Sequence, residues 1–238
     1  MGYSFLYLSC LAVLQLHKAS KSFGKKEVLK EVSFTLETGS ILGVFGRNGS
    51  GKSTLLKLMY GTLKGGCIEM EIDKIPVQPS EVITKRCIGY LPQHPFMPKN
   101  TKVRDVIPMY FKQEAQQDSI FYDPFVAKFT SRTIGELSTG QGRYLGLLLL
   151  AHLDHPFLFL DEPFSMIDPL QIVPLKELLL KIKTTKGIII TDHYYQDVLD
   201  ISSKNLLIHQ GEGISISTAK ELQKFGYLSS NRVISEKE

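Results

Sequence analysis

The fold is decided by one stretch, residues 41–53, which reads ILGVFGRNGSGKS. Its first five residues form an apolar run typical of a buried strand, and the rest fits the pattern G-x-x-x-x-G-K-[ST]. Apolar residues within Thr54–Tyr60 predict a helix packed on a sheet, and Gly61 predicts where that helix ends. Glycines let the backbone N–H groups of such a loop turn toward an anion at the positive end of the helix. The stretch therefore predicts a phosphate-binding loop between a strand and a helix.

A second apolar run, Phe157–Leu160, is followed directly by two carboxylates, Asp161 and Glu162. Ligands of open α/β sheets bind at the carboxyl ends of strands, and adjacent residues there point to opposite sides. We therefore expect Asp161, together with Ser53, to hold Mg²⁺, and Glu162 to polarise a water aimed at a γ-phosphate. Lys52 would neutralise phosphate charge. An Asp-Glu pair in a solvated loop is common, so these roles depend on the phosphate loop.

Strand-like and helix-like segments alternate along the chain. Residues Leu14–Leu36 indicate a β-hairpin with its turn near Gly24, and a first strand is expected at about Leu11–His17. A further buried-strand pattern covers Gly187–Thr191. Residues from about 93 to 137 contain several prolines and lack a strand pattern, so a mostly helical insertion is expected there. The whole pattern predicts a three-layer α/β domain with a largely parallel sheet.

The composition is that of an ordinary globular protein. The chain has 238 residues, of which 43% are hydrophobic and 22% are charged, so it can bury a core as one large domain or two small lobes. Disordered and fibrous classes are excluded. The net charge of +4 is too small to argue for a nucleic-acid partner. The three cysteines follow no metal-binding spacing, which indicates a reducing compartment without a structural metal.

The first sixteen residues are mostly apolar and carry no charge. They are shorter than the roughly 20 residues that span a bilayer, as is the other long apolar run, Tyr144–Leu153, so no membrane span is expected. A signal peptide would have Lys or Arg before its apolar part and a cleavage site with small residues after it, and both are missing. We favour a first strand preceded by a few extra apolar residues, and a start site placed too early stays open.

Three further segments narrow the class of phosphate-binding protein. Residues 91–93 read LPQ, residues 137–141 read LSTGQ, and residues 190–193 read ITDH. Along the chain the order is the phosphate loop, LPQ, LSTGQ, the acidic pair and ITDH. Together, over Leu14–Leu228, these motifs resemble the ATP-binding cassette (ABC) family. The resemblance implies a P-loop NTPase of ABC type, with a RecA-like core, an antiparallel β subdomain and a helical subdomain inserted at about residues 94–150.

The resemblance also divides the chain and names its cofactors. The ABC ATPase domain would cover residues 11–228, between an N-terminal extension at residues 1–10 and a polar tail at residues 229–238. The substrate and cofactor implied are ATP and Mg²⁺. His193 resembles the switch histidine that contacts the γ-phosphate, and with Glu162 it would be catalytic.

Nucleotide-binding roles are implied at the matching positions. Phe23 falls where the family has an aromatic residue that stacks on adenine, with Val28 beside it, although a lone aromatic is more often a core residue. Gln93 resembles the glutamine that contacts Mg²⁺ or the attacking water and joins the core to the helical subdomain. The implied metal ligands are Ser53, Gln93 and Asp161. The implied ATP-binding residues are Phe23, Gly46, Arg47, Asn48, Gly49, Ser50, Gly51, Lys52, Ser53, Thr54, Gln93, Ser138, Gly140 and Gln141.

Two motifs imply a second protomer. Ser138, Gly140 and Gln141 resemble the signature motif, which in the family caps the γ-phosphate bound to the opposite protomer. Alone, Ser138 would be an ordinary helix N-cap. Ser165 and Asp168 resemble the D-loop, which communicates across the dimer. The resemblance therefore implies a nucleotide-sandwich dimer, with itself or with another ABC subunit.

The signature departs from the family pattern at one position. The family usually has two glycines where this chain has Thr139-Gly140, so the backbone must take a normal conformation at the β-branched Thr139. We expect this change to tune hydrolysis without abolishing it. The next residues, Gly142–Leu145, are more apolar than is usual in the family, and packing is the interpretation that we favour.

The complete set of motifs favours one function. We expect ATP binding and hydrolysis by the nucleotide-binding subunit of an ABC transporter, driving transport through a transmembrane permease subunit on a separate chain. The subunit would dock through the helical insertion and lie on the cytoplasmic face of the membrane. The alternative is a soluble ABC ATPase acting on nucleic acid or ribosomes, but such proteins usually carry two cassettes or a coiled-coil insertion. A non-catalytic regulatory cassette is disfavoured by the intact Lys52, Asp161, Glu162 and His193.

Overall fold

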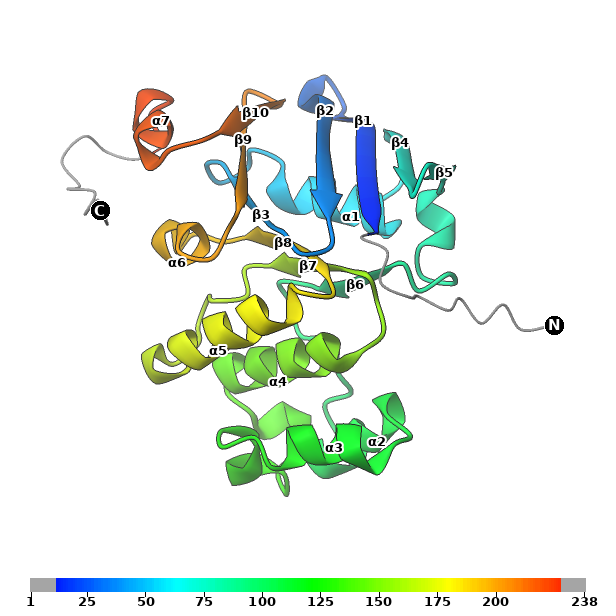
Figure 1. Cartoon of the computed structure of the whole chain (residues 1–238), viewed down its shortest axis with the longest axis vertical. Coiled ribbons are helices and arrows are strands. Elements are labelled where there is room, and N and C mark those ends of the chain that lie inside the picture. Colours follow the sequence, from blue (N-terminus) through cyan, green and yellow to red (C-terminus); the bar gives the residue numbers. More distant parts are fainter. Residues whose placement is uncertain (1–11, 228–238) are drawn as a thin grey trace.

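Two β-sheets and a helical lobe make up the part of the chain that this computed structural model describes, residues 12–227 (Figure 1). The expected N-terminal extension and polar tail lie outside the described residues. The helices are α1 (Lys52–Tyr60), α2 (Val103–Tyr110), α3 (Glu114–Phe121), α4 (Thr139–His152), α5 (Pro169–Ile182), α6 (Tyr195–Leu199) and α7 (Ala219–Lys224). In Figure 1 the sheets lie above α4 and α5, and α2 and α3 lie at the bottom.

The first sheet is antiparallel, with the strand order β2-β1-β4-β5. Its strands are β1 (Val13–Phe23), β2 (Lys26–Glu37), β4 (Cys67–Ile72) and β5 (Ile75–Pro76). β1 and β2 form the predicted hairpin, which turns at Gly24, where φ is 58°. The first strand runs to Phe23, well beyond the predicted end at His17. Alternate side chains of a strand face one side, and Leu14 and Leu16 of β1 are fully buried.

The second sheet has six strands in the order β10-β9-β3-β8-β7-β6. They are β3 (Ile41–Phe45), β6 (Ile88–Leu91), β7 (Phe157–Asp161), β8 (Gly187–Thr191), β9 (Lys204–His209) and β10 (Glu212–Ile216). Every pair is parallel except β10 with β9, which confirms the predicted largely parallel sheet. β3, β7 and β8 are buried along their whole length, and this explains their uninterrupted apolar sequences.

The parallel sheet separates two hydrophobic cores. Leu42 and Val44 of β3 pack with α1 and the antiparallel sheet on one face. Ile41 and Phe45 of the same strand pack on the other face, in the core that holds α4, α5 and the helical lobe. Side chains of one strand thus alternate between the two cores. The result is the three-layer arrangement predicted from the alternation of strands and helices.

The segment between residues 93 and 137 is helical in character, as predicted. It contains α2, α3 and two short 3₁₀ helices, η2 (Val126–Phe129) and η3 (Ile134–Glu136). Their apolar residues pack against α4, which leads back to the parallel sheet. None of the helices within residues 12–227 is both long enough and apolar enough to cross a membrane.

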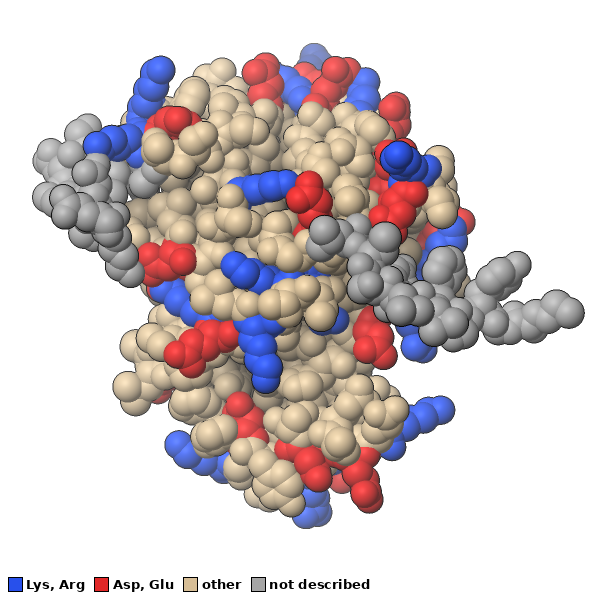
Figure 2. Space-filling model, in the orientation of Figure 1, with Lys and Arg blue, Asp and Glu red and all other residues tan. Residues whose placement is uncertain are grey.

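Charged side chains are mixed by sign on the surface. On the face that Figure 2 shows, Lys and Arg are scattered among Asp and Glu rather than gathered into one patch. This distribution agrees with the small net charge of +4. It lacks, on that face, the basic stripe that nucleic-acid binding uses.

Candidate functional site

The phosphate loop connects β3 to α1, in the place that the sequence predicts. Two of its glycines are required by the backbone. Gly46 has φ 152°, and a Cβ added there would lie 2.8 Å from the carbonyl oxygen of Ile208. Gly51, the residue before α1, has φ 111°, and its Cβ would lie 2.8 Å from the side chain of Leu29. A side chain at either position would clash with a neighbouring segment, so this loop conformation requires glycine at both.

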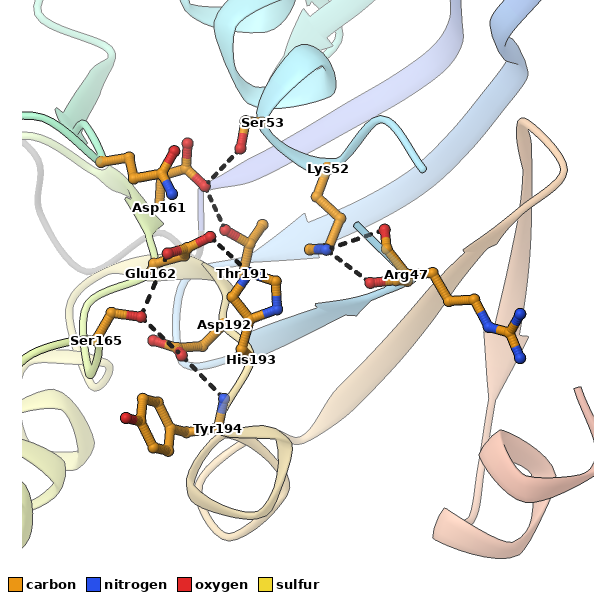
Figure 3. Close-up of polar contacts among 12 residues, drawn as sticks. Arg47, Lys52, Ser53, Asp161, Glu162, Ser165, Thr191, Asp192, His193 and Tyr194 are labelled. Atoms are coloured by element: carbon orange, nitrogen blue, oxygen red, sulfur yellow. Dashed lines mark hydrogen bonds and ion pairs between the residues drawn. The ribbon is translucent and has the colours of Figure 1, made fainter. Parts of the chain in front are cut away.

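Lys52 lies inside the loop rather than in solvent (Figure 3). Its Nζ donates to the carbonyl oxygens of Gly46, at 2.6 Å, and Arg47, at 3.5 Å, and the residue is only 7% exposed. Burial lowers the pKa of the ammonium group, and the nearby carboxylates of Glu162, Asp161 and Asp192 oppose that shift. The ammonium is thus held against the carbonyl oxygens at the start of the loop.

Asp161 is fully buried at the end of β7 and collects three hydroxyl groups. Its Oδ1 accepts hydrogen bonds from Ser53 Oγ at 3.0 Å and from Thr191 Oγ1 at 2.7 Å. Its Oδ2 accepts a hydrogen bond from Tyr90 Oη at 3.3 Å. Burial and the neighbouring carboxylate raise the pKa of the Tyr90 phenol. The structure thus brings Ser53 and Asp161, two of the three predicted Mg²⁺ ligands, into contact.

Glu162 follows the last residue of β7 and has side-chain partners other than those of Asp161. Its φ of 57° is left-handed, which is uncommon outside glycine. Its Oε1 lies 2.9 Å from His193 Nε2, and Ser165 Oγ donates to its Oε2 at 3.3 Å (Figure 3). The Glu162 side chain is 12% exposed and that of His193 is 44% exposed. The two predicted catalytic residues therefore form a pair at the mouth of the site.

One cavity of about 410 Å³ gathers most of the predicted nucleotide-binding residues. Phe23 is at its edge, half exposed, and Lys21 Nζ lies 4.8 Å from the centre of the Phe23 ring. Within the described residues, the buried Ser50 Oγ of the loop has no hydrogen-bond partner. The lining residues are Phe23, Val28, Asn48, Gly49, Ser50, Gly51, Lys52, Ser53, Thr54, Gln93, Glu162 and His193.

The signature residues Ser138, Gly140 and Gln141 are not part of this lining. They begin α4, where Ser138 Oγ accepts a hydrogen bond from the backbone N–H of Gln141 at 3.1 Å and Gln141 Oε1 accepts one from the backbone N–H of Ser138 at 3.0 Å. This is a capping box, which stabilises the start of a helix. Thr139 is the first residue of α4 and so takes an ordinary helical conformation, as its β-branched side chain requires. The signature is therefore a helix start with Ser138 and Thr139 exposed and Gly140 buried, apart from the phosphate cavity of its own chain.

Sequence reasoning missed several residues of the site. Asp192 is fully buried, and its carboxylate accepts hydrogen bonds from the backbone N–H groups of Phe164, at 2.8 Å, and Tyr194, at 3.0 Å. Burial raises the pKa of Asp192, and those backbone hydrogen bonds oppose the shift. Thr191 and Asp192 follow the apolar part of a buried strand, as Asp161 does. Their position at the end of that strand could have identified them as site residues. Asp168 caps α5 by accepting from the backbone N–H of Leu170 at 2.9 Å.

Comparisons with known proteins agree with this geometry. A family model described as "ABC transporter" matches residues 29–165. The lipopolysaccharide export system ATP-binding protein LptB of Escherichia coli is 26% identical over 224 residues, covering 89% of this chain and 93% of that protein. A probable ABC transporter ATP-binding protein of Azorhizobium caulinodans is 27% identical over 203 residues, covering 81% of this chain and 72% of that protein.

Solved structures share the fold. A structure described as the ATP-binding subunit of an ABC transporter has a TM-score of 0.77 at 20% identity and covers 92% of this chain and 95% of its own. A nucleotide-free ATP-binding cassette from an ABC transporter has a TM-score of 0.75 at 20% identity and covers 92% of this chain and 96% of its own. The expectation of a transporter component is confirmed over that of an ATPase acting on nucleic acid. The chain belongs to the ABC transporter family, in which it is the ATP-binding component, an ATPase that energises transport.

Proposed function

We propose that the chain hydrolyses MgATP in the cavity between the phosphate loop and the ends of β7 and β8. One observation carries this proposal. A single cavity gathers Lys52, Ser53 beside Asp161, and the pair formed by Glu162 and His193. Phosphoryl transfer needs positioning and neutralisation of charge more than covalent chemistry, and these groups supply both.

The residues at Asp161 fit a magnesium ion. Ser53 Oγ and Asp161 Oδ1 are oxygen donors 3.0 Å apart, and Gln93 lines the same cavity. Mg²⁺ prefers oxygen ligands and keeps several of its waters, so a few protein ligands suffice. When bound there, Mg²⁺ would neutralise charge on the β- and γ-phosphates.

The other groups divide the remaining work. Lys52 and the loop N–H groups bind the phosphates, and Phe23 at the edge of the cavity stacks on the adenine. Glu162 orients the attacking water and accepts its proton. His193 contacts the γ-phosphate, and its Nε2 lies 2.9 Å from Oε1 of Glu162, beside the carboxylate that acts on the water.

Two copies of the chain, or this chain and another ABC subunit, complete each site. The cavity of one chain does not include Ser138, Gly140 or Gln141, which start the 14-residue helix α4. A helix N-terminus favours phosphate, and Ser138 and Thr139 are exposed at this one. We infer that the signature of each protomer covers the γ-phosphate bound to the other, so that hydrolysis depends on closure of the dimer.

A transmembrane permease subunit docks on the helical subdomain, at about residues 94–150. Between the end of α2 and the end of α4 lies a groove of about 330 Å³, whose lining includes Met109, Tyr110, His152 and His155. Met109 is 66% exposed and Tyr110 is 36% exposed. Exposed apolar side chains around a groove are typical of a protein contact. We assign this groove to a cytoplasmic loop of the permease, which would hold the chain on the cytoplasmic face of the membrane.

The catalytic assignment is tested with Glu162→Gln. We expect ATP binding to persist while steady-state hydrolysis falls by about 10²–10⁴-fold, the usual contribution of a general base. Glu177→Gln, the same change on an exposed position of α5, should leave both unchanged. Undiminished hydrolysis in Glu162→Gln would contradict the proposal.

The permease is tested by mild detergent extraction and co-purification with the wild-type chain. A membrane protein should travel with the chain, and Met109→Glu should release it because a buried charge without a partner is costly. Recovery of the chain with ribosomes or DNA instead would overturn the assignment.

A further inference from the structure

Arg143 joins three segments of the site although it lies outside the phosphate cavity. It is on the first turns of α4, five residues after the helix cap Ser138. Its Nη1 donates hydrogen bonds to the backbone carbonyl oxygens of Asp161, at 3.0 Å, and Glu162. Its Nη2 donates to the carbonyl oxygen of Gln93 at 2.5 Å. One guanidinium thus holds the two segments that carry the acidic pair and the expected glutamine ligand.

The surroundings of Arg143 fix its orientation. The side chain is partly buried, and within the described residues its Nε has no hydrogen-bond partner. Burial lowers the pKa of the guanidinium, and the carboxylates of Glu162, Asp192 and Asp161 oppose that shift. A guanidinium is a rigid plane whose N–H groups point in set directions, so three carbonyls bound to it are held in register with one another. A lysine could not make the same set of bonds.

The bond to Glu162 bears on the catalytic carboxylate. Glu162 has a left-handed backbone with φ 57°, which persists only where its surroundings hold it. Its N–H donates to the carbonyl oxygen of Thr191 at 2.7 Å, and its own carbonyl accepts from Arg143. The residue is therefore held on both sides. The direction of its side chain toward His193 follows from the backbone so fixed.

The next residue ties the same helix to the helical lobe. Tyr144 Oη donates to Asp123 Oδ2 at 2.9 Å, and its ring lies 5.4 Å from the ring of Phe125. Asp123 in turn accepts from the backbone N–H groups that begin η2. Successive residues of α4 thus bind the helical lobe on one side and the catalytic segments on the other.

We propose that Arg143 is a positioning residue, which holds the backbones of Glu162 and Gln93 in the arrangement that hydrolysis requires and makes turnover depend on the position of the helical lobe. This inference rests on the proposed catalytic role of Glu162. It assigns a function to a segment whose composition alone favoured simple packing.

The test compares Arg143→Met and Arg143→Lys with the wild-type chain. Binding of a fluorescent ATP analogue, kcat, KM and the thermal midpoint are measured for each. In Arg143→Met we expect kcat to fall by about 10²-fold, the effect of a misplaced catalytic group, while affinity stays within about threefold. Arg143→Lys keeps the positive charge but not the planar guanidinium with its fixed N–H directions, so its kcat should fall nearly as much. An unchanged kcat in either variant would overturn the inference, and the lysine variant keeps the test valid should the methionine variant not fold.

Lys186→Met is the matched control. Lys186 is a buried cation that donates to two backbone carbonyl oxygens, those of Leu153, at 2.6 Å, and His155, at 2.9 Å. Its loss should lower the thermal midpoint and leave kcat unchanged. If Lys186→Met lowered kcat as much as Arg143→Met, the effect would be general loosening, and the inference would fail.

A double variant separates this inference from the proposed function. Two of the three hydrogen bonds of Arg143 go to the segment of Asp161 and Glu162, so we expect most of its effect on the rate to act through Glu162. Adding Arg143→Met to Glu162→Gln should then lower the residual single-turnover rate by less than about threefold. A further loss as large as in the wild-type background would overturn the inference while leaving Glu162 in its role. Undiminished hydrolysis in Glu162→Gln alone would instead overturn the proposed function.

Discussion

The second residue of α4 after its cap, Gly140, offers a sharp test of the packing between the signature and the D-loop. A Cβ added at Gly140 would lie 2.1 Å from the carbonyl oxygen of Met166 and 3.1 Å from its carbonyl carbon. Because the obstacle is backbone, the D-loop must retreat by about 1 Å, and such overpacking costs about 1–3 kcal/mol. Alanine returns at most about 1 kcal/mol of helix propensity. The net loss is up to about 2 kcal/mol. We therefore expect Gly140→Ala to lower the thermal midpoint by up to about 8 °C, at about 2–4 °C per kcal/mol for a chain of this size.

Gly142, in the same helix, is the control. A Cβ added there meets nothing within 4 Å, and the backbone is helical. Gly142→Ala should therefore raise the thermal midpoint by about 2–4 °C through helix propensity alone. Differential scanning calorimetry of the isolated chain measures both variants without nucleotide. Equal midpoints for the two alanine variants would refute the reasoning, because only the clash with Met166 distinguishes them.

Three further outcomes are expected. Burial, and then the charges of Lys186 and Arg86, lower the pKa of His155 from its ordinary 6.5. The contribution of the neutral imidazole to stability is therefore present above that pH and is lost as pH falls through the folded pKa. Between pH 7 and pH 5, the thermal midpoint of His155→Gln should fall less than that of the wild type. Tyr144→Phe should cost about 1.5–3 kcal/mol in urea unfolding, since it removes a hydrogen bond to a carboxylate. Chelation of Mg²⁺ should abolish hydrolysis, and Ser53→Ala should raise the Mg²⁺ concentration needed for half-maximal rate, which a titration measures.

Much of the fold and the cavity could be predicted because local pattern and chemistry agree there. The run Ile41–Phe45 is buried on both faces in the structure, which is why it has no polar residue. A short apolar run of this kind could be predicted to be a buried strand. The loop that follows needs glycine at Gly46 and Gly51 because a side chain would clash there. The glycines themselves are visible in the sequence, so the loop could be recognised. The adjacent carboxylates Asp161 and Glu162 have different partners, as their different predicted roles need: Ser53 and Thr191 bind the first, and His193 lies against the second.

The residues that the sequence did not reveal act through the backbone or through distant partners. Tyr90 and Thr191 reach Asp161 from two neighbouring strands, and only the register of the parallel sheet makes them neighbours. Tyr90 also belongs to a strand whose apolar pattern explains it without any polar role. Arg143 binds carbonyl oxygens, which every residue has, so no side chain in the sequence marks its partners. Contacts of this kind follow from the fold and cannot be read from residue types.

The start of α4 shows why the same turn of helix can sense both the nucleotide and the helical lobe. Gly140 lets the D-loop carbonyl of Met166 approach, while Arg143, on the next turn, binds the carbonyl oxygens of Asp161 and Glu162. Both contacts are made to backbone, so they move segments rather than single side chains. Tyr144 fixes that turn to the lobe through Asp123. If Arg143 has the positioning role proposed for it, a displacement of the lobe by a partner should move the D-loop and Glu162 as well and so change the rate of hydrolysis.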